Sequence, residues 1–170
     1  VFLGLLSFEK QADRFLSSLP GLYQKLTQSG FNNLRFRVLG RKSNDFDPQK
    51  IIDSHIEFKE MDLKIEFVSN PNEILKQSKI FFSLQRTDNY PSKSLLEAVA
   101  CGNLPVVTLS GNSEMIARRE FAEFVPQKFD STDLFDACRK ILSYDESEFS
   151  KRTTLATKFV QENFSIERST

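Results

Sequence analysis

The chain has 170 residues, 39% of them hydrophobic, and its 23 lysines and arginines balance 23 aspartates and glutamates. A chain of this length buries roughly 70% of its unfolded surface in one core, so residues 1–170 are predicted to form one domain. Because neither sign of charge is concentrated in a long run, nucleic acid and anionic membrane surfaces are not expected as partners. No apolar run approaches the ~20 residues that span a bilayer.

The cysteines and the single histidine restrict the chemistry further. Cys101 and Cys138 stand without a paired-cysteine motif, which indicates a reducing compartment, and we expect a cytoplasmic protein. His55 is the only histidine, which disfavours a histidine-rich metal site and a histidine-based nucleophile relay. The chain begins in an apolar run without methionine, so we interpret it as a fragment of a longer two-domain protein.

Short apolar runs alternate with helical patterns along the chain. Six runs are predicted to be strands: residues 1–6, 34–39, 63–68, 80–84, 104–108 and 121–125. The helical pattern between the first two runs, residues 15–26, contains Pro20 and Gly21, which should kink or divide it. The strict alternation of strands and helices favours an α/β fold with a doubly wound, Rossmann-like parallel sheet of six strands.

Caps and apolar spacing predict the later helices. Two helix starts carry an Asp or Asn cap followed by proline, at Asp47–Pro48 and at Asn70–Pro71. The first of these helices is predicted to continue through Ile56. Apolar residues at helical spacing predict two last helices, over residues 134–142 and from 149 to near Asn163.

The predicted sheet places a ligand crevice between two loops. In the common strand order 3-2-1-4-5-6, strands 1 and 4 are neighbours, and the crevice opens at their carboxyl ends. The loops there are residues 7–11, which include Lys10, and residues 85–94, which lead into a helix near Ser92 to Ser94. The first turn of that helix offers unpaired backbone N–H groups, and together with Lys10 it suits a diphosphate. Glu97 lies a turn deeper among apolar residues, and a ribose diol supplies the donors that its carboxylate needs, so the pattern predicts a nucleotide-sugar site.

These residues also have ordinary structural interpretations, which stay open at this point. Lys10 is also consistent with a solvated lysine at a helix start. Ser94, Glu97 and Cys101 lie at spacings of three and four, which is typical of the solvated stripe of an amphipathic helix.

One segment resembles a known family. Residues 89–107, NYPSKSLLEAVACGNLPVV, resemble the nucleotide-binding domain of group-1 glycosyltransferases with the GT-B fold. The family pattern has an acidic residue, seven intervening residues and a glutamate, followed by Ala, a hydrophobic residue, Ala, a small residue, Gly and then Pro-Val-Val. Glu97 matches the glutamate, which implies that it binds the nucleotide ribose. In the family, the first acid contacts the donor sugar. The resemblance assigns this position to Asp88 if the loop carries one inserted residue, and to Asn89 if it does not.

Two other segments support the resemblance. Gly4 and Lys10 match a glycine and a lysine after the family's first strand, which implies that Lys10 holds the donor diphosphate. Leu5 stands where the family has arginine, so one implied phosphate contact is missing. Gly111 and Glu114 match a glycine loop and a glutamate near the donor sugar, although a turn with a capping glutamate has the same pattern.

The resemblance implies the C-terminal, donor-binding half of a retaining glycosyltransferase. Residues 162–167 agree with this, because they resemble the segment before the family's final helix. Such an enzyme moves a sugar from a nucleotide diphosphate to a glycan or lipid-linked acceptor and needs no metal or other cofactor. The implied catalytic residues are Lys10, Asp88 and Glu97. The implied donor-binding residues are Gly4, Lys10, Asn89, Ser92, Lys93, Ser94, Glu97, Gly111 and Glu114.

The resemblance also sets expectations for the longer protein. The acceptor is expected to bind through a missing N-terminal domain, so the isolated chain is predicted to bind a nucleotide without transferring sugar. Only the full-length protein is expected to associate with a membrane, and then peripherally. Two alternatives remain open: a catalytically silent GT-B binding module, which Leu5 and the displaced acid favour, and a nucleotide-sugar epimerase of the same fold.

A second motif competes for a metal role. Asp45-Phe46-Asp47 has the spacing of the metal-binding acids in the other major glycosyltransferase fold. However, Asp47 before Pro48 is explained as a helix cap, and it follows the second strand rather than facing the crevice. We therefore predict no metal site.

Overall fold

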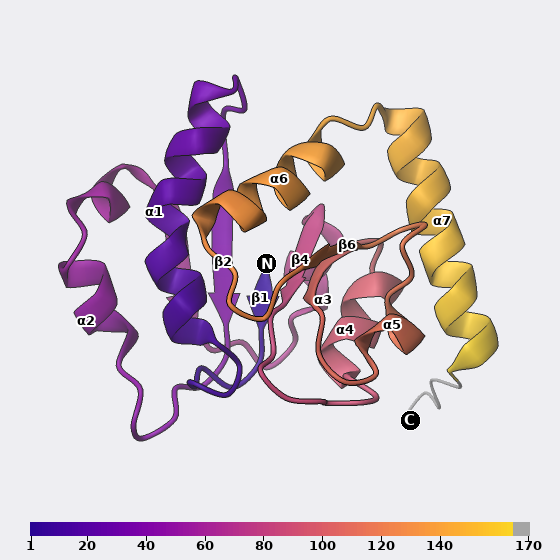
Figure 1. Ribbon diagram of the computed structural model, residues 1–170, viewed down its shortest axis with the longest axis horizontal. Helices are drawn as coiled ribbons and strands as arrows, with labels where there is room; N and C mark the ends of the chain where they lie inside the picture. Colours follow the sequence, from indigo (N-terminus) through magenta and orange to yellow (C-terminus); the bar gives the residue numbers. More distant parts are fainter. Residues whose placement is uncertain (165–170) are drawn as a thin grey trace.

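The computed structural model describes residues 1–164, which contain one sheet of six strands that are all parallel (Figure 1). The strands are β1 (Phe2–Leu3), β2 (Arg35–Leu39), β3 (Asp62–Glu66), β4 (Ile80–Ser83), β5 (Leu104–Thr108) and β6 (Glu123–Val125). Their order across the sheet is β3-β2-β1-β4-β5-β6, as predicted, so the carboxyl ends of β1 and β4 lie side by side at one edge.

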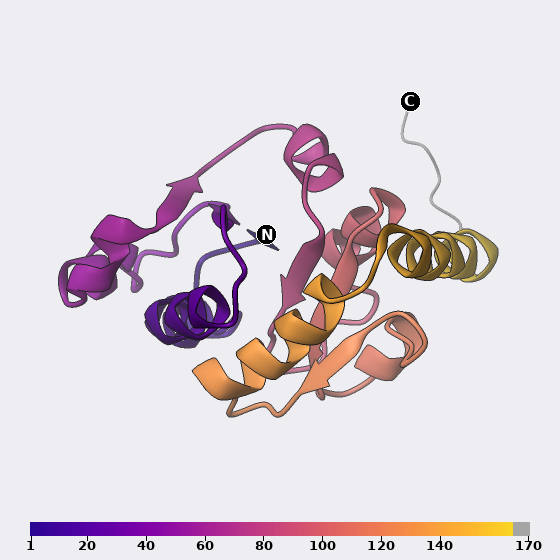
Figure 2. The same ribbon diagram turned by 90° about the horizontal axis from the view of Figure 1, so that it is seen from above.

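Helices cover both faces of the sheet (Figure 2). On one face, α1 (Ala12–Gln28) packs against α6 (Ser131–Leu142). On the other face lie α3 (Asn72–Lys76), α4 (Lys93–Ala100) and α7 (Glu146–Asn163). The remaining helices are α2 (Pro48–Asp53), the 3₁₀-helix η1 (Ile56–Glu60) and α5 (Ser113–Ile116). This arrangement is the doubly wound α/β fold predicted from the alternation of strands and helices.

The first helix is continuous, so the expected division at Pro20 and Gly21 is wrong. Its apolar face is buried against the sheet through Phe15, Leu16, Leu19, Leu22 and Leu26. Gly21 lies against α6, where an added Cβ would come within 2.8 Å of the Ser131 hydroxyl. The buried face and the close contact between the helices hold α1 together despite the backbone hydrogen bond that proline removes.

The first strand is shorter than its predicted run, because the chain turns sharply at Gly4. Gly4 has a φ of 147°, and only Leu6 pairs again beyond it, with Lys42. The Gly4 carbonyl packs directly against Gly40, whose φ is 152°, and a Cβ at Gly40 would overlap that carbonyl oxygen. The chain just after β1 and just after β2 therefore packs too closely for a side chain at residue 40.

For the two middle helices, α2 and α3, the predicted caps agree with the structure better than the predicted helix lengths do. The Asp47 carboxylate accepts a hydrogen bond from the Gln49 backbone N–H at 3.1 Å, which confirms the cap of α2. Ile56, expected on the apolar face of that helix, instead begins η1 and is 74% exposed. The start of α3 is later than expected, at Asn72, whose backbone N–H donates to the Asn70 side chain at 3.1 Å.

The last two helices, α6 and α7, confirm the predicted pair, and α7 ends at Asn163. Residues 165–167 of the segment that resembles the one before the family's final helix lie outside the described residues. Within residues 1–164, no helix combines the length and the apolar character needed to cross a membrane.

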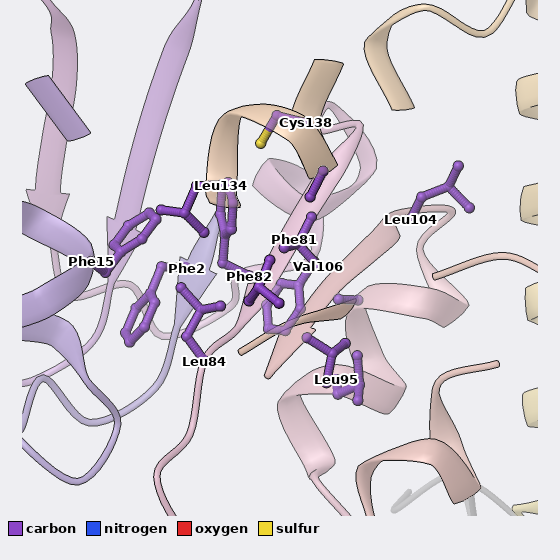
Figure 3. Close-up of a cluster of buried hydrophobic side chains, with 14 of the residues drawn as sticks. Phe2, Phe15, Phe81, Phe82, Leu84, Leu95, Leu104, Val106, Leu134 and Cys138 are labelled. Atoms are coloured by element: carbon purple, nitrogen blue, oxygen red, sulfur yellow. The ribbon is translucent and has the colours of Figure 1, made fainter. Parts of the chain in front are cut away.

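Aromatic side chains join the sheet to its helices in the core (Figure 3). Phe15 of α1 packs on Phe2 of β1 and Phe82 of β4, with ring centroids 5.3 and 4.8 Å apart. Every residue of β5 is buried, as expected for an inner parallel strand covered on both faces. Because each buried aromatic or aliphatic side chain contributes about 1.5–3 kcal/mol, these contacts fix β1, β4 and β5 below the crevice.

Candidate functional site

The loops after β1 and β4 are joined directly at the carboxyl edge of the sheet. The Arg86 backbone N–H donates to the Glu9 carbonyl at 3.1 Å. The guanidinium of Arg86 lies 3.8 Å from the carboxylate of Asp13 in the first turn of α1. Leu84, which is 1% exposed, anchors the second loop in the core. The two segments that the strand order predicted to face a ligand therefore lie together.

A chain of hydrogen bonds, here named the Lys10 relay, connects Lys10, Gln85 and Ser92. The Lys10 ammonium donates to Gln85 Oε1 at 3.1 Å, and Gln85 Nε2 donates to the Ser92 hydroxyl at 3.4 Å. Ser92 is 4% exposed and caps α4, because its hydroxyl accepts a hydrogen bond from the Leu95 backbone N–H at 3.4 Å. The fully buried Thr108 donates its hydroxyl to the Gln85 carbonyl at 2.8 Å and fixes the middle of the relay.

The Lys10 relay places a positive charge beside the start of a helix. The first turn of α4 leaves backbone N–H groups without intrahelical partners, and the helix dipole adds partial positive charge there. Burial lowers the pKa of Lys10, while the nearby Glu9 carboxylate acts in the opposite direction. A bound phosphate would offset the cost of burying the Lys10 ammonium. The phosphate itself would be stabilised by that ammonium and by the start of the helix.

A second pair of residues, here named the Asp88 clamp, joins the loops after β4 and β5. Asp88 Oδ2 accepts a hydrogen bond from Asn112 Nδ2 at 2.8 Å, and Asp88 Oδ1 accepts one from the Asn112 backbone N–H at 3.2 Å. Gly111 has a φ of 50°, and a Cβ there would overlap the Asp88 side chain. The structure thus brings the predicted Asp88 and Gly111 into contact.

A small pocket lies between the relay and the clamp. Its cavity volume is about 20 Å³, and it is lined in part by Gln85, Asp88, Asn89, Ser92 and Asn112. A space of this size holds about one water molecule. A larger ligand must therefore lie over these loops rather than within the pocket.

Glu97 lies on the side of α4 away from the core. Its side chain is 37% exposed, and Oε1 lies 3.8 Å from the Lys93 ammonium, which is itself 89% exposed. The buried face of α4 consists of Leu95, Ala98 and Val99. Glu97 is therefore not enclosed by apolar groups: solvent reaches its carboxylate and Lys93 lies beside it, so the fold alone does not require a ligand there. The carboxylate remains accessible one turn from the start of α4.

The other predicted residues differ in how they meet the crevice. A Cβ at Gly4 would meet nothing within 4 Å, so the glycine leaves open space beside the loop. The next residue, Leu5, is 51% exposed at the position where the family has arginine. Ser94 lies beside the relay, with its hydroxyl 3.4 Å from that of Ser92. Glu114 is 59% exposed and pairs with Arg119 at 3.3 Å, so the structure does not join it to the clamp.

The two acids of the competing metal motif have local partners. Asp47 caps α2, and Asp45 accepts a hydrogen bond from the Ser43 hydroxyl at 2.6 Å. Within residues 1–164, no three His, Cys, Asp or Glu side chains gather as a metal-binding group would require.

Sequence reasoning missed Gln85 and Asn112, which connect the predicted residues to each other. Gln85 directly follows the apolar run of residues 80–84, and a polar residue just after a central strand is a usable signal. Asn112 follows a glycine in a turn, a position that indicates only a loop. Its contact with Asp88 becomes visible only in the tertiary structure.

Comparison with known proteins agrees with this fold. The family model described as glycosyl transferases group 1 matches residues 1–157. The chain matches no curated protein sequence.

Similar solved structures include the C-terminal domain of the group 1 family glycosyl transferase LpcC from Francisella tularensis, with 18% identity and a TM-score of 0.75 over 98% of this chain and 85% of that chain. The catalytic domain of cholesterol-α-glucosyltransferase from Helicobacter pylori is 18% identical, with a TM-score of 0.67 over 94% of this chain and 96% of that one.

A third similar structure is HepE from Anabaena in complex with UDP, which is 12% identical with a TM-score of 0.74. That alignment covers 96% of this chain but 43% of HepE, so the chain spans less than half the length of that relative. At these identities the likeness establishes the fold alone. The family model, which matches residues 1–157 of 170, shows that the chain belongs to the group 1 glycosyl transferases.

Proposed function

We propose that the chain is the donor-binding half of a glycosyltransferase that transfers a sugar from a nucleotide diphosphate to a glycan or a lipid-linked acceptor. The observation that carries this proposal is the Lys10 relay, in which an ammonium and the capped start of α4 are joined through Gln85. An ammonium and a free helix start that converge from two loops suit the two phosphates of one nucleotide.

On the diphosphate side of the crevice, Lys10 neutralises the charge that develops on the departing nucleotide, and the backbone N–H groups near Ser92, Lys93 and Ser94 share it. Such preorganised donors stabilise a leaving group without reorganisation during the reaction. The open space beside Gly4 admits a phosphate close to the backbone. In this proposal the leaving group is stabilised without a metal or other cofactor, and the reaction retains the anomeric configuration.

On the other side, Asp88 accepts a hydrogen bond from a hydroxyl of the donor sugar, with Gly111 and Glu114 beside it. If the loop has no inserted residue, Asn89 takes the place of Asp88. Glu97 binds the ribose diol from the exposed side of α4, where its carboxylate is accessible. Each of these contacts uses a carboxylate or amide whose remaining acceptor positions face solvent.

The coverage of one relative supports placing the acceptor on a second domain. Since the chain spans 43% of HepE, a protein solved with UDP bound, we place the acceptor site on a further domain. Holding two substrates together accounts for much of the acceleration in group transfer, so this chain alone binds a nucleotide without turnover. The full-length protein acts in the cytoplasm and contacts a membrane, where its acceptor requires it, only at the surface.

One observation favours a second candidate, a catalytically silent module that binds a partner or a glycan. Leu5 is 51% exposed where the family has a phosphate-binding arginine, so one cation is missing from the crevice. A nucleotide-sugar epimerase of the same fold is separated from a transferase by analysing the products of the full-length protein.

The experiment is a thermal-shift panel of UDP, GDP, ADP and TDP sugars with the purified chain. A ligand at 100 times its dissociation constant raises the free energy of unfolding by about 2.7 kcal/mol, which is easily detected. We expect one nucleotide class to stabilise the chain and Gln85→Met, which breaks the Lys10 relay, to reduce that shift. No shift with any nucleotide sugar would favour the silent module.

A further inference from the structure

Asn112 contacts both oxygens of a single carboxylate. Its side-chain amide donates to Asp88 Oδ2 at 2.8 Å, and its backbone N–H donates to Oδ1 at 3.2 Å. The two residues come from loops after different strands, so the Asp88 clamp fixes the distance between those loops as well as the rotation of the carboxylate. A carboxylate held at two points loses its rotational freedom before any ligand arrives.

The clamp leaves Asp88 able to bind a further group. A carboxylate has about four acceptor positions, and the clamp uses one on each oxygen. Both Asp88 and Asn112 are exposed, so the remaining positions are open to a ligand lying over the loops. The carboxylate is therefore oriented and still available.

The neighbouring backbone is shaped for this contact. Gly111 packs so closely on Asp88 that a Cβ would overlap it, and its φ of 50° brings the Asn112 backbone N–H to the carboxylate. The Ser110 backbone N–H donates to the Ser113 hydroxyl at 3.3 Å and closes the same turn. A turn held on both sides of Asn112 therefore keeps this exposed residue in contact with Asp88.

We propose that Asn112 is a positioning residue, which orients the Asp88 carboxylate toward a hydroxyl of the donor sugar. This inference rests on the proposed function, because it assigns Asp88 to the sugar part of a nucleotide sugar. Asn112 acts only through Asp88, whereas the diphosphate of the nucleotide is bound by the Lys10 relay. The opposite effect, in which Asn112 occupies Asp88 and competes with the sugar, predicts tighter binding when Asn112 is removed.

The test measures calorimetric affinities of the chain for UDP-glucose, GDP-mannose, ADP-glucose and TDP-glucose and for the four matching nucleoside diphosphates. The comparison uses the nucleotide sugar that binds the wild-type chain and its matching nucleoside diphosphate. Asn112→Ala is expected to lower the affinity for the nucleotide sugar about fivefold to tenfold and the affinity for the diphosphate less than about twofold. Asn32→Ala is the matched control, because the Asn32 amide donates to the Gly30 carbonyl at 3.4 Å in an exposed loop at the opposite edge of the sheet. It should change neither affinity.

A double variant separates orientation from stability. In Asp88→Asn with Asn112→Asp, the amide and the carboxylate exchange places, so the loops can still be joined while the acid is moved. We expect this variant to unfold within a few degrees of the wild-type midpoint and to lose the same selective affinity for the nucleotide sugar.

The outcomes distinguish the two proposals. Equal losses for sugar and diphosphate, no loss, or tighter binding of the nucleotide sugar to Asn112→Ala would each overturn the positioning role while leaving the proposed function intact. Full selective affinity in the double variant would also overturn it. A wild-type chain that binds none of the eight probes would overturn the proposed function, and the positioning role with it.

Discussion

The two sides of the crevice differ in how firmly the protein holds them. The Lys10 relay is built on Ser92, which is 4% exposed, and on a Gln85 carbonyl held by the fully buried Thr108. The Asp88 clamp lies between two exposed residues, Asp88 and Asn112. Hydrogen bonds in a low dielectric are stronger, whereas exposed ones exchange with water. The comparison indicates that both sides are oriented before a ligand binds, and that the relay side is held more rigidly than the clamp side.

Two glycines repeat the same difference. Gly40 supports the relay side, where an added Cβ would overlap the backbone carbonyl of Gly4. Gly111 supports the clamp side, where the overlap would be with the side chain of Asp88. A backbone carbonyl at the end of a core strand cannot move without disturbing the sheet. The overlap at Gly111 includes the Cβ of Asp88, so the exposed loop that carries Asp88 must shift, and an exposed loop moves more easily than a core strand. The same substitution, glycine to alanine, is therefore expected to destabilise the protein more at Gly40 than at Gly111.

The largest effect is expected from Gly40→Ala. The substitution adds backbone strain at a φ of 152° and a collision with Gly4, and we expect it to lower the free energy of unfolding by about 3 kcal/mol or more. Urea unfolding measures the loss. Gly30→Ala is the control, because Gly30 has a φ of 91° but no atom within 4 Å of an added Cβ. Equal losses in the two variants would show that the contact between Gly40 and Gly4 is unimportant.

The next largest effect is expected from Lys10→Met, which keeps the length of the side chain and removes its charge. Binding of the nucleoside diphosphate should weaken by about 2–3 kcal/mol, the scale of a charge-assisted hydrogen bond, with an unchanged unfolding midpoint. Titration calorimetry measures the change, and Lys50→Met on the exposed side of α2 serves as the control. Unchanged affinity would show that Lys10 does not bind the diphosphate and is a solvated lysine at a helix start.

The same lysine predicts a pH dependence. Burial lowers the pKa of Lys10, so the free chain loses this positive charge at a lower pH than an ordinary lysine would. Nucleotide affinity should therefore fall as the pH rises through that lowered pKa. Lys10→Arg should move the fall to higher pH, because a guanidinium stays protonated. A pH profile that is identical in the two proteins would exclude Lys10 as the titrating group.

A smaller effect is expected from Glu97→Gln. This substitution tests the proposed ribose contact, which belongs to neither the Lys10 relay nor the Asp88 clamp. The nucleoside diphosphate should bind about 1–2 kcal/mol more weakly, while inorganic pyrophosphate, which has no ribose, should bind as before. Glu162→Gln is a close control, because Glu162 also lies 3.8 Å from a lysine four residues away on its helix. If Glu97→Gln behaves like its control, Glu97 belongs to the solvated stripe of α4.

The clamp side is tested by comparing Asp88→Asn with Asn89→Ala in the full-length protein. If the loop has an inserted residue, Asp88→Asn should reduce turnover at least tenfold, about 1.4 kcal/mol, and more than Asn89→Ala. Steady-state kinetics with the donor gives the order. The reverse order would assign the sugar contact to Asn89 and leave the fold unchanged.

The smallest effect is expected from Gly111→Ala. The strain at a φ of 50° and the displacement of the exposed loop that carries Asp88 should lower the free energy of unfolding by about 1 kcal/mol, close to the loss in Gly30→Ala. Urea unfolding measures both variants. A loss as large as that of Gly40→Ala would remove the difference between the two sides.

The sequence by itself determined the fold and the edge at which the site lies. The six strands follow from short apolar runs, and the Asp47 cap follows from a residue and its immediate neighbours. Such features depend on local periodicity and on hydrogen bonds within one turn, so a sequence contains them completely. The expected strand order then placed Lys10 and Ser92 at one edge, as the structure has them.

Only the tertiary structure decided how these residues meet. Gln85 contacts Lys10 across 75 positions of the chain, and Asn112 contacts Asp88 across 24. Glu97 is accessible rather than enclosed because the rotation of α4 turns Leu95 and its apolar neighbours to the core. Contacts of this kind depend on how helices rotate and on which rotamers the packing allows, and both are settled only when distant segments pack together.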